Sequence, residues 1–260
     1  MQILAVINQK GGAGKTTLAS HVGQAAVEAR KRTLFVDLDP QGSLSLSHPP
    51  ADGAAAGLTA SMLFSTEASE LRPERLGDRL ALVRADSTLS RLSGNVAGAE
   101  RRLAANLRRF ADDYDVCVID TPGAIGFNPP MTVSALIAAD AVICPFAVGL
   151  YEGRALADLW EYLKVIKTPA YNPRLRLMGL LPSKINTRSP EEVAALADLR
   201  KQFGPIIVPG MLAERAAVKK AVMNRRPVWK NTKGAGHLAA AREWRSVCSY
   251  ILLNLGETAK

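Results

Sequence analysis

Short apolar runs alternate along the chain with segments whose apolar residues recur every three or four positions. The predicted strands are residues 2–8, 33–37, 79–84, 116–120, 141–146, 175–181 and 206–208. The predicted helices are residues 15–30, 98–113, 152–166, 189–203, 212–223 and 236–255. Repeated strand–helix units form right-handed crossovers, so the pattern predicts an α/β fold with a mostly parallel sheet and helices on both faces.

The chain shows no internal repeat, no low-complexity tract and no linker that would divide it. Residues 40–57, rich in Ser, Pro, Ala and Gly, are the longest predicted irregular stretch and are expected to form a surface loop. A length of 260 residues suits one α/β unit. We therefore expect a single domain over residues 1–260.

A glycine-rich loop joins the first strand to the first helix. It reads Lys10-Gly11-Gly12-Ala13-Gly14-Lys15-Thr16-Thr17. The end of the loop matches the P-loop pattern G-x-x-x-x-G-K-[ST], although Gln9 stands where the first glycine of that pattern belongs. Glycines let successive N–H groups face phosphate oxygens at a helix N-terminus. The loop therefore predicts nucleotide binding, with Lys15 at the β and γ phosphates and the Thr16 hydroxyl on Mg²⁺.

Lys10 adds a second positive charge to the loop, although Lys15 already serves the local γ-phosphate. At this position Lys10 is able to point away from its own nucleotide and reach a phosphate on another chain, as an arginine finger does. The alternative is a solvated surface lysine.

Carboxylates follow two of the apolar strands, where α/β sheets bind their ligands. Asp120 ends the run 116–120, and Asp37 and Asp39 follow residues 34–36 in the same way. A carboxylate placed there suits Mg²⁺ opposite a phosphate loop. Thr16, Asp37 and Asp120 are the predicted metal ligands, whereas a turn or a helix cap is the alternative for any single aspartate.

Four segments together resemble the ParA/MinD family of deviant Walker ATPases over nearly the whole chain. The first is the KGGxGKTT loop at residues 10–17, and the second is the DxDPQG segment at residues 37–42. The others are the Walker B strand at residues 118–122 and the strand at residues 138–145. The DPQG motif, without an additional N-terminal DNA-binding domain, is most similar to short ParA-type partition ATPases.

The resemblance implies a slow, Mg²⁺-dependent ATPase that hydrolyses ATP to ADP and phosphate. It implies an ATP-sandwich homodimer in which Lys10 crosses to the partner's nucleotide, while Asp39 orients the attacking water. Lys10, Lys15 and Asp39 are therefore the expected catalytic residues. A ParB-like, centromere-binding adaptor is the implied partner, in a cytoplasmic, nucleoid-associated setting.

The net charge of +9 is unevenly divided along the chain. Residues 1–150 carry 14 Lys and Arg against 15 Asp and Glu, whereas residues 151–260 carry 19 against 9. Such an excess indicates a polyanionic partner, nucleic acid first and an anionic membrane surface second. We expect sequence-independent DNA binding, although solvated helix faces also carry such charge. The candidate DNA-binding residues are Arg188, Arg215, Lys219, Lys220, Arg225 and Arg226.

Other functional classes are disfavoured by composition. No apolar run is long enough to span a membrane. The three cysteines, Cys117, Cys144 and Cys248, are widely spaced, which disfavours a disulfide framework or a zinc site. Two of them lie in predicted strands, unlike the loop cysteines that hold the cluster of nitrogenase-type reductases.

Two alternatives to a DNA-partitioning ATPase remain open. A MinD-type membrane-positioning ATPase needs a terminal amphipathic helix, and residues 238–255 carry an apolar stripe that is expected to pack on the core instead. The second alternative is a DNA-transfer accessory factor that binds a specific DNA site.

Overall fold

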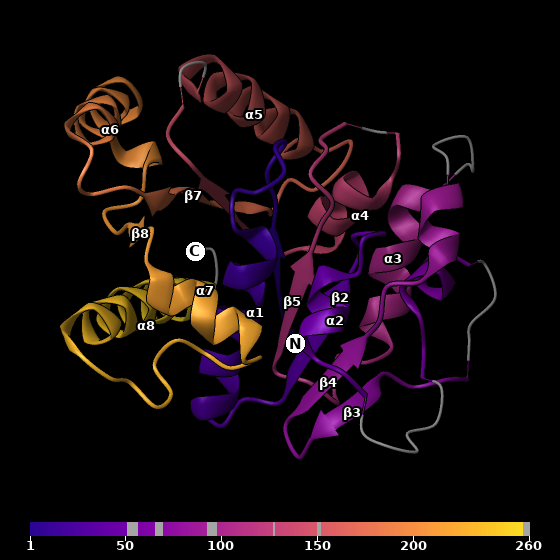
Figure 1. The fold of residues 1–260 in the computed structure, drawn as a ribbon. Helices are drawn as coiled ribbons and strands as arrows, with labels where there is room; N and C mark the ends of the chain where they lie inside the picture. The colour runs from indigo at the N-terminus through magenta and orange to yellow at the C-terminus, as the bar shows by residue number, and fades with distance from the viewer. Residues whose placement is uncertain (51–56, 66–69, 93–97, 127, 150–151, 257–260) are drawn as a thin grey trace.

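The computed structural model describes residues 1–50, 57–65, 70–92, 98–126, 128–149 and 152–256 (Figure 1). The strands are β1 (Gln2–Val6), β2 (Thr33–Asp37), β3 (Glu74–Gly77), β4 (Leu80–Val83), β5 (Val116–Asp120), β6 (Ala141–Phe146), β7 (Arg176–Ile185) and β8 (Leu212–Ala213). The α-helices are α1 (Lys15–Glu28), α2 (Ser43–Ser47), α3 (Ala99–Arg108), α4 (Met131–Ala138), α5 (Glu152–Ile166), α6 (Pro190–Phe203), α7 (Ala216–Met223) and α8 (Ala235–Gly256). Short 3₁₀ helices cover Ala60–Phe64, Ser87–Arg91 and Gly204–Ile206.

Within these residues the strands form one sheet in the order β3-β4-β2-β5-β1-β6-β7-β8. Every neighbouring pair is parallel except β3 and β4, which run antiparallel at one edge. The predicted α/β class with a mostly parallel sheet is confirmed. Strand β1 lies between β5 and β6, so the loop that follows it opens near the middle of the sheet's carboxyl edge.

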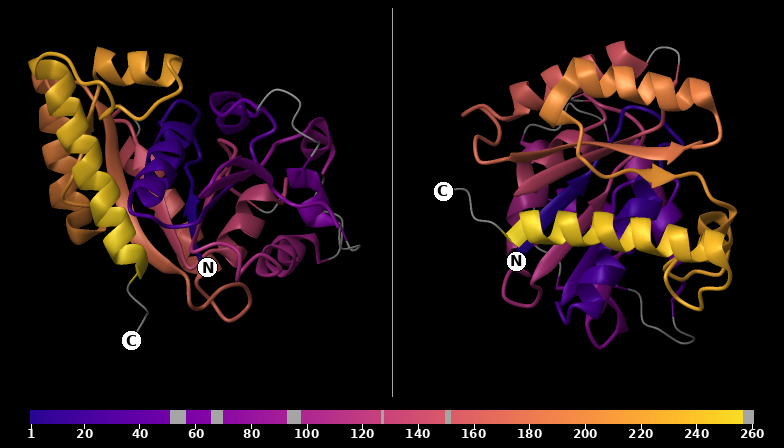
Figure 2. Two further views of the ribbon diagram at one scale, coloured as in Figure 1. Left: turned by 90° about the horizontal axis from the view of Figure 1, so that it is seen from below. Right: turned by 90° about the vertical axis from the view of Figure 1, so that its left-hand side faces the viewer.

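Both faces of the sheet are covered, because successive residues of a strand point to opposite sides. In β1, Ile3 and Ala5 pack into one apolar cluster with residues of α3, α4, α5 and α6, whereas Leu4 and Val6 pack into another with α1, α7 and α8. Figure 2 shows α6 and α8 on opposite sides of strands β7 and β8. This layering confirms helices on both faces.

Several predicted elements differ from those observed. The predicted strand at residues 206–208 is wrong as a strand, since Gly204–Ile206 is a 3₁₀ helix and Ile207 makes only an isolated bridge to Leu180. The helix predicted from residue 212 begins at Ala216, because Leu212–Ala213 pairs with β7. Residues 40–57 include helix α2, and part of that stretch, residues 51–56, lies outside the described residues.

The apolar stripe of α8 packs on the core, as expected. Trp244, Val247, Cys248, Ile251 and Leu255 are all buried in the cluster shared with α1 and α7. This stripe is therefore not an exposed membrane-facing surface. Among the described helices none combines the length and apolarity needed to cross a bilayer.

Candidate nucleotide-binding site

The phosphate loop connects the end of β1 to the first residue of α1. Gly12 and Gly14 have positive φ angles of 78° and 90°, a backbone conformation that residues other than glycine rarely adopt. The loop therefore curls over the N-terminus of α1, whose unpaired N–H groups favour an anion. Gly11, Gly12, Gly14, Lys15, Thr16 and Thr17 line a cavity of about 340 Å³, whereas Ala13 is buried beneath the loop.

Strand register places two carboxylates beside this loop. Asp37 at the end of β2 pairs in register with Asp120 at the end of β5, and Asp120 pairs in turn with Val6 of β1. Both aspartates are fully buried. The parallel arrangement alone brings them together, since the carboxyl ends of parallel strands meet at one edge.

Asp120 has the features of a cation ligand. Apart from the nearby Thr16 hydroxyl, its buried carboxylate oxygens have no hydrogen-bond partner among the described residues. Burial raises the pKa of Asp120 to about 8, while the Thr16 hydroxyl and the charge of Lys15 act in the opposite direction. A buried carboxylate without a partner is costly unless a cation or a proton satisfies it. Asp120 and Thr16 therefore fit a Mg²⁺ ion bound next to the phosphate loop.

Asp37 is engaged differently from Asp120. One of its carboxylate oxygens accepts hydrogen bonds from the Ser45 N–H and hydroxyl, at 2.8 and 2.7 Å, and the other accepts from the Asp39 N–H at 3.2 Å. Burial raises its pKa, and these hydrogen bonds oppose the shift. Asp37 thereby ties α2 to the end of β2. Its predicted role as a direct metal ligand stays a prediction.

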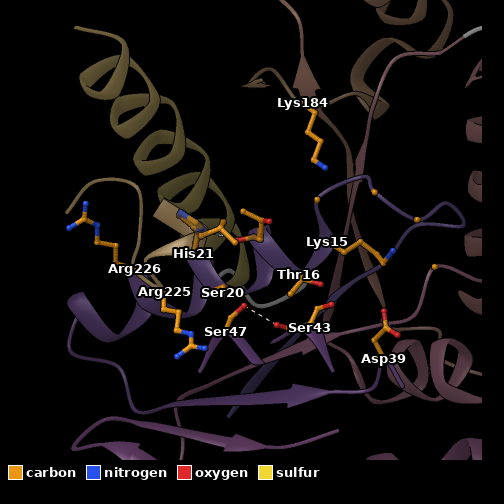
Figure 3. A pocket seen from close by; sticks show the side chains of 16 residues that line it. Lys15, Thr16, Ser20, His21, Asp39, Ser43, Ser47, Lys184, Arg225 and Arg226 are labelled. Atoms are coloured by element: carbon orange, nitrogen blue, oxygen red, sulfur yellow. Dashed lines mark hydrogen bonds between the residues drawn. The ribbon is translucent and has the colours of Figure 1, made fainter. Parts of the chain in front are cut away.

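Asp39 lies in the cavity wall opposite the phosphate loop (Figure 3). Its carboxylate accepts a hydrogen bond from the Gln41 N–H at 3.0 Å, and its carbonyl accepts one from the Gly42 N–H at 2.8 Å. Asp39 therefore does form a turn, which the sequence analysis gave as the alternative role for an aspartate at this position. This turn holds the carboxylate at the cavity rather than away from it.

The two lysines of the loop point in different directions. Lys15 is buried, its ammonium donates to the Lys10 carbonyl at 3.3 Å, and burial lowers its pKa against the charges of Asp120 and Asp39. Lys10 does not line the cavity, and its ammonium pairs with Glu152 of α5 at 2.8 Å. Lys10 is thus directed away from the local phosphate site, and Glu152 is a partner that the sequence analysis did not identify.

Gly123 closes the loop from the other side. A Cβ at this position would lie 3.1 Å from the Gly11 nitrogen and 3.3 Å from the Lys10 carbonyl carbon. The backbone after β5 therefore approaches the phosphate loop so closely that a side chain at this position would require the loop to shift by a few tenths of an ångström. The Thr-Pro-Gly sequence after Asp120 is a local signal for this contact.

A second, more apolar cavity of about 300 Å³ adjoins the phosphate loop. Gly14, Thr17 and Lys184 border it on the loop side. Its other walls come from β8, α7 and α8, through Leu212, Val218, Val222 and Trp244 among others. An apolar cavity beside phosphate-binding backbone has the composition of a base-binding site.

The basic residues predicted to bind DNA fall into two places. Five of the six line one open cavity of about 1130 Å³, together with Lys233; they are Arg188, Arg215, Lys219, Lys220 and Arg226. Arg225 lines the phosphate-loop cavity near Ser47 and not the basic cavity, whereas Arg226 borders both cavities (Figure 3). The φ angle of Arg225, just past the end of α7, is 50°, in the left-handed region.

Two of the six Lys and Arg side chains that line this basic cavity already have acidic partners. Arg215 pairs with Glu243 of α8, and Lys219 pairs with Glu214 at 2.7 Å. Within the described residues no carboxylate pairs with the other four, which are Arg188, Lys220, Arg226 and Lys233. The charge available to an anionic ligand is therefore concentrated in these four side chains.

Comparison with known proteins adds independent information. A family model described as an AAA domain matches residues 1–177. Protein IncC of Escherichia coli is 30% identical over 259 residues, which is 98% of this chain and 70% of IncC. The chromosome partitioning protein ParA of Myxococcus xanthus strain DK1622 is 30% identical over 227 residues, or 80% of this chain and 75% of that protein. The structure of cobyrinic acid a,c-diamide synthase from Mycobacterium smegmatis with an ATP analog and magnesium is 25% identical, with a TM-score of 0.76, and covers 99% of this chain and 98% of that one.

Proposed function

The chain belongs to the ParA/MinD family of deviant Walker ATPases, with ATP and Mg²⁺ as cofactors, and we propose that it is a ParA-type partition or positioning ATPase. In this proposal ATP assembles a homodimer on nonspecific DNA, and a ParB-like adaptor stimulates hydrolysis and release. The protein acts as a single domain in the cytoplasm, associated with the nucleoid. The observation that carries the proposal is a phosphate loop whose second lysine, Lys10, is directed away from its own nucleotide cavity.

Each residue of the site has a part in hydrolysis under this proposal. Lys15 binds the β and γ phosphates, and its lowered pKa reflects a buried position that an anionic ligand would compensate. Thr16 and Asp120 would hold Mg²⁺, and the bound ion would supply positive charge next to the transferred phosphoryl group. Asp39, held at the cavity by its turn, orients the attacking water.

Lys10 completes the site of a second copy of the chain. In the monomer its ammonium is held by Glu152, whose carboxylate is buried at the start of α5. For Lys10 to reach the partner's nucleotide this ion pair must open. Dimer formation is therefore coupled to a local rearrangement, which is consistent with a slow, regulated ATPase.

The base of the nucleotide enters the apolar cavity between β8, α7 and the loop. Thr17 and Lys184 border both this cavity and the phosphate-loop cavity, so the two adjoin. A nucleoside diphosphate spans such a pair of sites, with its base among Leu212, Val218 and Val222. Lys219 of α7 lines both this apolar cavity and the basic cavity, so nucleotide and DNA would bind next to each other at this helix.

DNA binding follows from the basic cavity, and its test is a salt series. We replace Arg188 and Lys220 with alanine and measure fluorescence anisotropy on random duplex DNA with ATP and with ADP. Affinity should fall with salt, with a slope near −0.9 per phosphate neutralised, and the double variant should flatten that slope by about two units. As a matched control, Arg108→Ala with Lys201→Ala removes the same charge on α3 and α6, outside the basic cavity.

The alternatives predict different results in the same assay. ATP should strengthen DNA binding, because a dimer presents two such cavities and the second contact becomes intramolecular. Binding to anionic liposomes without any binding to duplex DNA would favour a membrane-positioning ATPase. A footprint confined to one sequence would favour the DNA-transfer accessory factor.

A further inference from the structure

Lys184 occupies an unusual place at the end of β7. Its φ angle is 56°, in the left-handed region that lysine rarely adopts. The pairing of β7 with β8 shifts register between Ser183 and Ile185, so Lys184 is the extra residue of a bulge. Bulges re-aim side chains and are frequent beside active sites, and strained backbone of this kind persists where its surroundings impose it.

The bulge directs Lys184 over the phosphate loop. Its Cε would lie 3.8 Å from a Cβ placed on Gly14, and Figure 3 shows its ammonium end pointing toward the loop. Lys184 is in the wall of both the phosphate-loop cavity and the apolar cavity. The loop is thus flanked by two lysines, with Lys15 on the side of Asp39 and Asp120 and Lys184 on the side of the base cavity.

The charge of Lys184 has no close acidic partner among the described residues. No carboxylate there lies within 4 Å of its ammonium, and the nearby Glu214 pairs with Lys219 instead. An exposed lysine on a strained backbone, aimed at an anion-binding loop, suits a ligand with negative charge.

We propose that Lys184 binds the α-phosphate of the nucleotide, on the side of the loop opposite Lys15. This proposal rests on the nucleotide site described above. Lys15 lies toward Asp39 and Asp120, where under the proposed function the β and γ phosphates and Mg²⁺ would bind. A lysine above Gly14 and Thr17, between the loop and the base cavity, meets the phosphate next to the ribose. Lys184 therefore holds ATP and ADP equally and takes no part in hydrolysis.

The test is Lys184→Asn, because asparagine adopts left-handed backbone more readily than lysine and should preserve the bulge. We expect the dissociation constants of fluorescent ATP and ADP, measured with Mg²⁺, both to rise about tenfold, the loss of one charge-assisted phosphate contact. KM for ATP should rise by the same factor at unchanged kcat, since the contact is made equally in ground and transition states. Lys184→Arg should restore most of the affinity.

Arg30→Asn is the matched control for backbone strain. Arg30 has a φ angle of 62° just after α1 and lies outside both cavities. Both Asn variants should melt at a temperature equal to or above that of the wild type, but only Lys184→Asn should weaken nucleotide binding. Wild-type affinity in Lys184→Asn, a loss confined to ATP, or a fall in kcat at constant KM would each overturn the assignment. If the wild-type protein itself binds neither nucleotide, the proposed ATPase function fails and this inference fails with it.

Discussion

The ion pair between Lys10 and Glu152 should oppose dimerisation, and its removal should strengthen the ATP-bound dimer. The Lys10 ammonium lies 2.8 Å from a carboxylate of Glu152, whose side chain is only 6% exposed, whereas that of Lys10 is 46% exposed. Glu152 is the first residue of α5, where the helix dipole also favours a negative charge. The carboxylate is therefore fixed, and Lys10 is the partner that moves.

The size of the effect follows from the substitution Glu152→Gln. A charge-assisted hydrogen bond contributes about 1.5–3 kcal/mol and a neutral one about 0.5–1.5 kcal/mol. Because Lys10 is half exposed and screened by water, we take the difference at its low end, about 1 kcal/mol per subunit. Two ion pairs open in a symmetric dimer. The dimer should therefore be stabilised by about 2 kcal/mol, which lowers its dissociation constant about 30-fold.

Analytical ultracentrifugation with Mg²⁺ and a non-hydrolysable ATP analogue measures this constant directly. Glu161→Gln is the matched control, since it removes the same charge from an exposed pair with Lys164 on the same helix. We expect the control to dimerise like the wild type. A dissociation constant for Glu152→Gln equal to or higher than that of the wild type would refute the idea that Glu152 restrains Lys10.

Three further predictions concern the site and the fold. Lys15→Ala should abolish nucleotide binding in a fluorescent-ATP titration, and near wild-type affinity would show that the loop is wrongly interpreted. Asp39→Ala should still bind ATP but release phosphate slowly; unchanged turnover would leave Asp39 a turn residue only. His21 Nδ1–H donates to the Thr17 carbonyl at 2.7 Å, and Nε2 accepts from the Val228 N–H at 3.1 Å, so the ring is neutral. Burial lowers the pKa of His21 to about 4. The neutral ring stabilises the fold fully above about pH 6.5, and this stabilisation is lost as the pH falls toward 4. Urea denaturation should show that the His21 ring accounts for a loss of about 2 kcal/mol in the free energy of unfolding between pH 7.5 and pH 5. Burial lowers the pKa of His48 to about 4 as well, so the two histidines should share the acid-induced loss of stability. His21→Gln should therefore remove about half of the loss in free energy of unfolding that the wild type shows. An unchanged pH dependence in this variant would contradict this reasoning.

Local sequence determined the elements that carry the nucleotide site. The strands at residues 33–37, 116–120 and 141–146 and the helix at residues 152–166 have the predicted boundaries. A central parallel strand is buried on both faces, so it needs a continuous apolar run, and it ends where polar ligand-binding residues begin. The phosphate loop needs glycine at positive φ and a lysine at a helix start, which are also local requirements.

Elements stabilised by distant contacts were missed. Helix α4 is buried on nearly every side, from Met131 to Leu136, so its sequence has no polar face to reveal a helical period. Strand β8 has only two residues and exists because they pair with β7, and β3 is a short edge strand with alternating exposure. No short window of sequence contains the partner that makes these segments regular.

The tertiary structure alone decided which charges meet. Lys10 and Glu152 are 142 residues apart in sequence, yet they form the ion pair that directs Lys10 away from its own site. A bulge turns Lys184 over the phosphate loop, and packing places Arg225 at the phosphate-loop cavity but Arg226 at the border of both this cavity and the basic one. Sequence composition fixes the number of charges, whereas a charge acts through the groups within a few ångströms of it. Those distances are set by the packing of strands and helices and not by order along the chain.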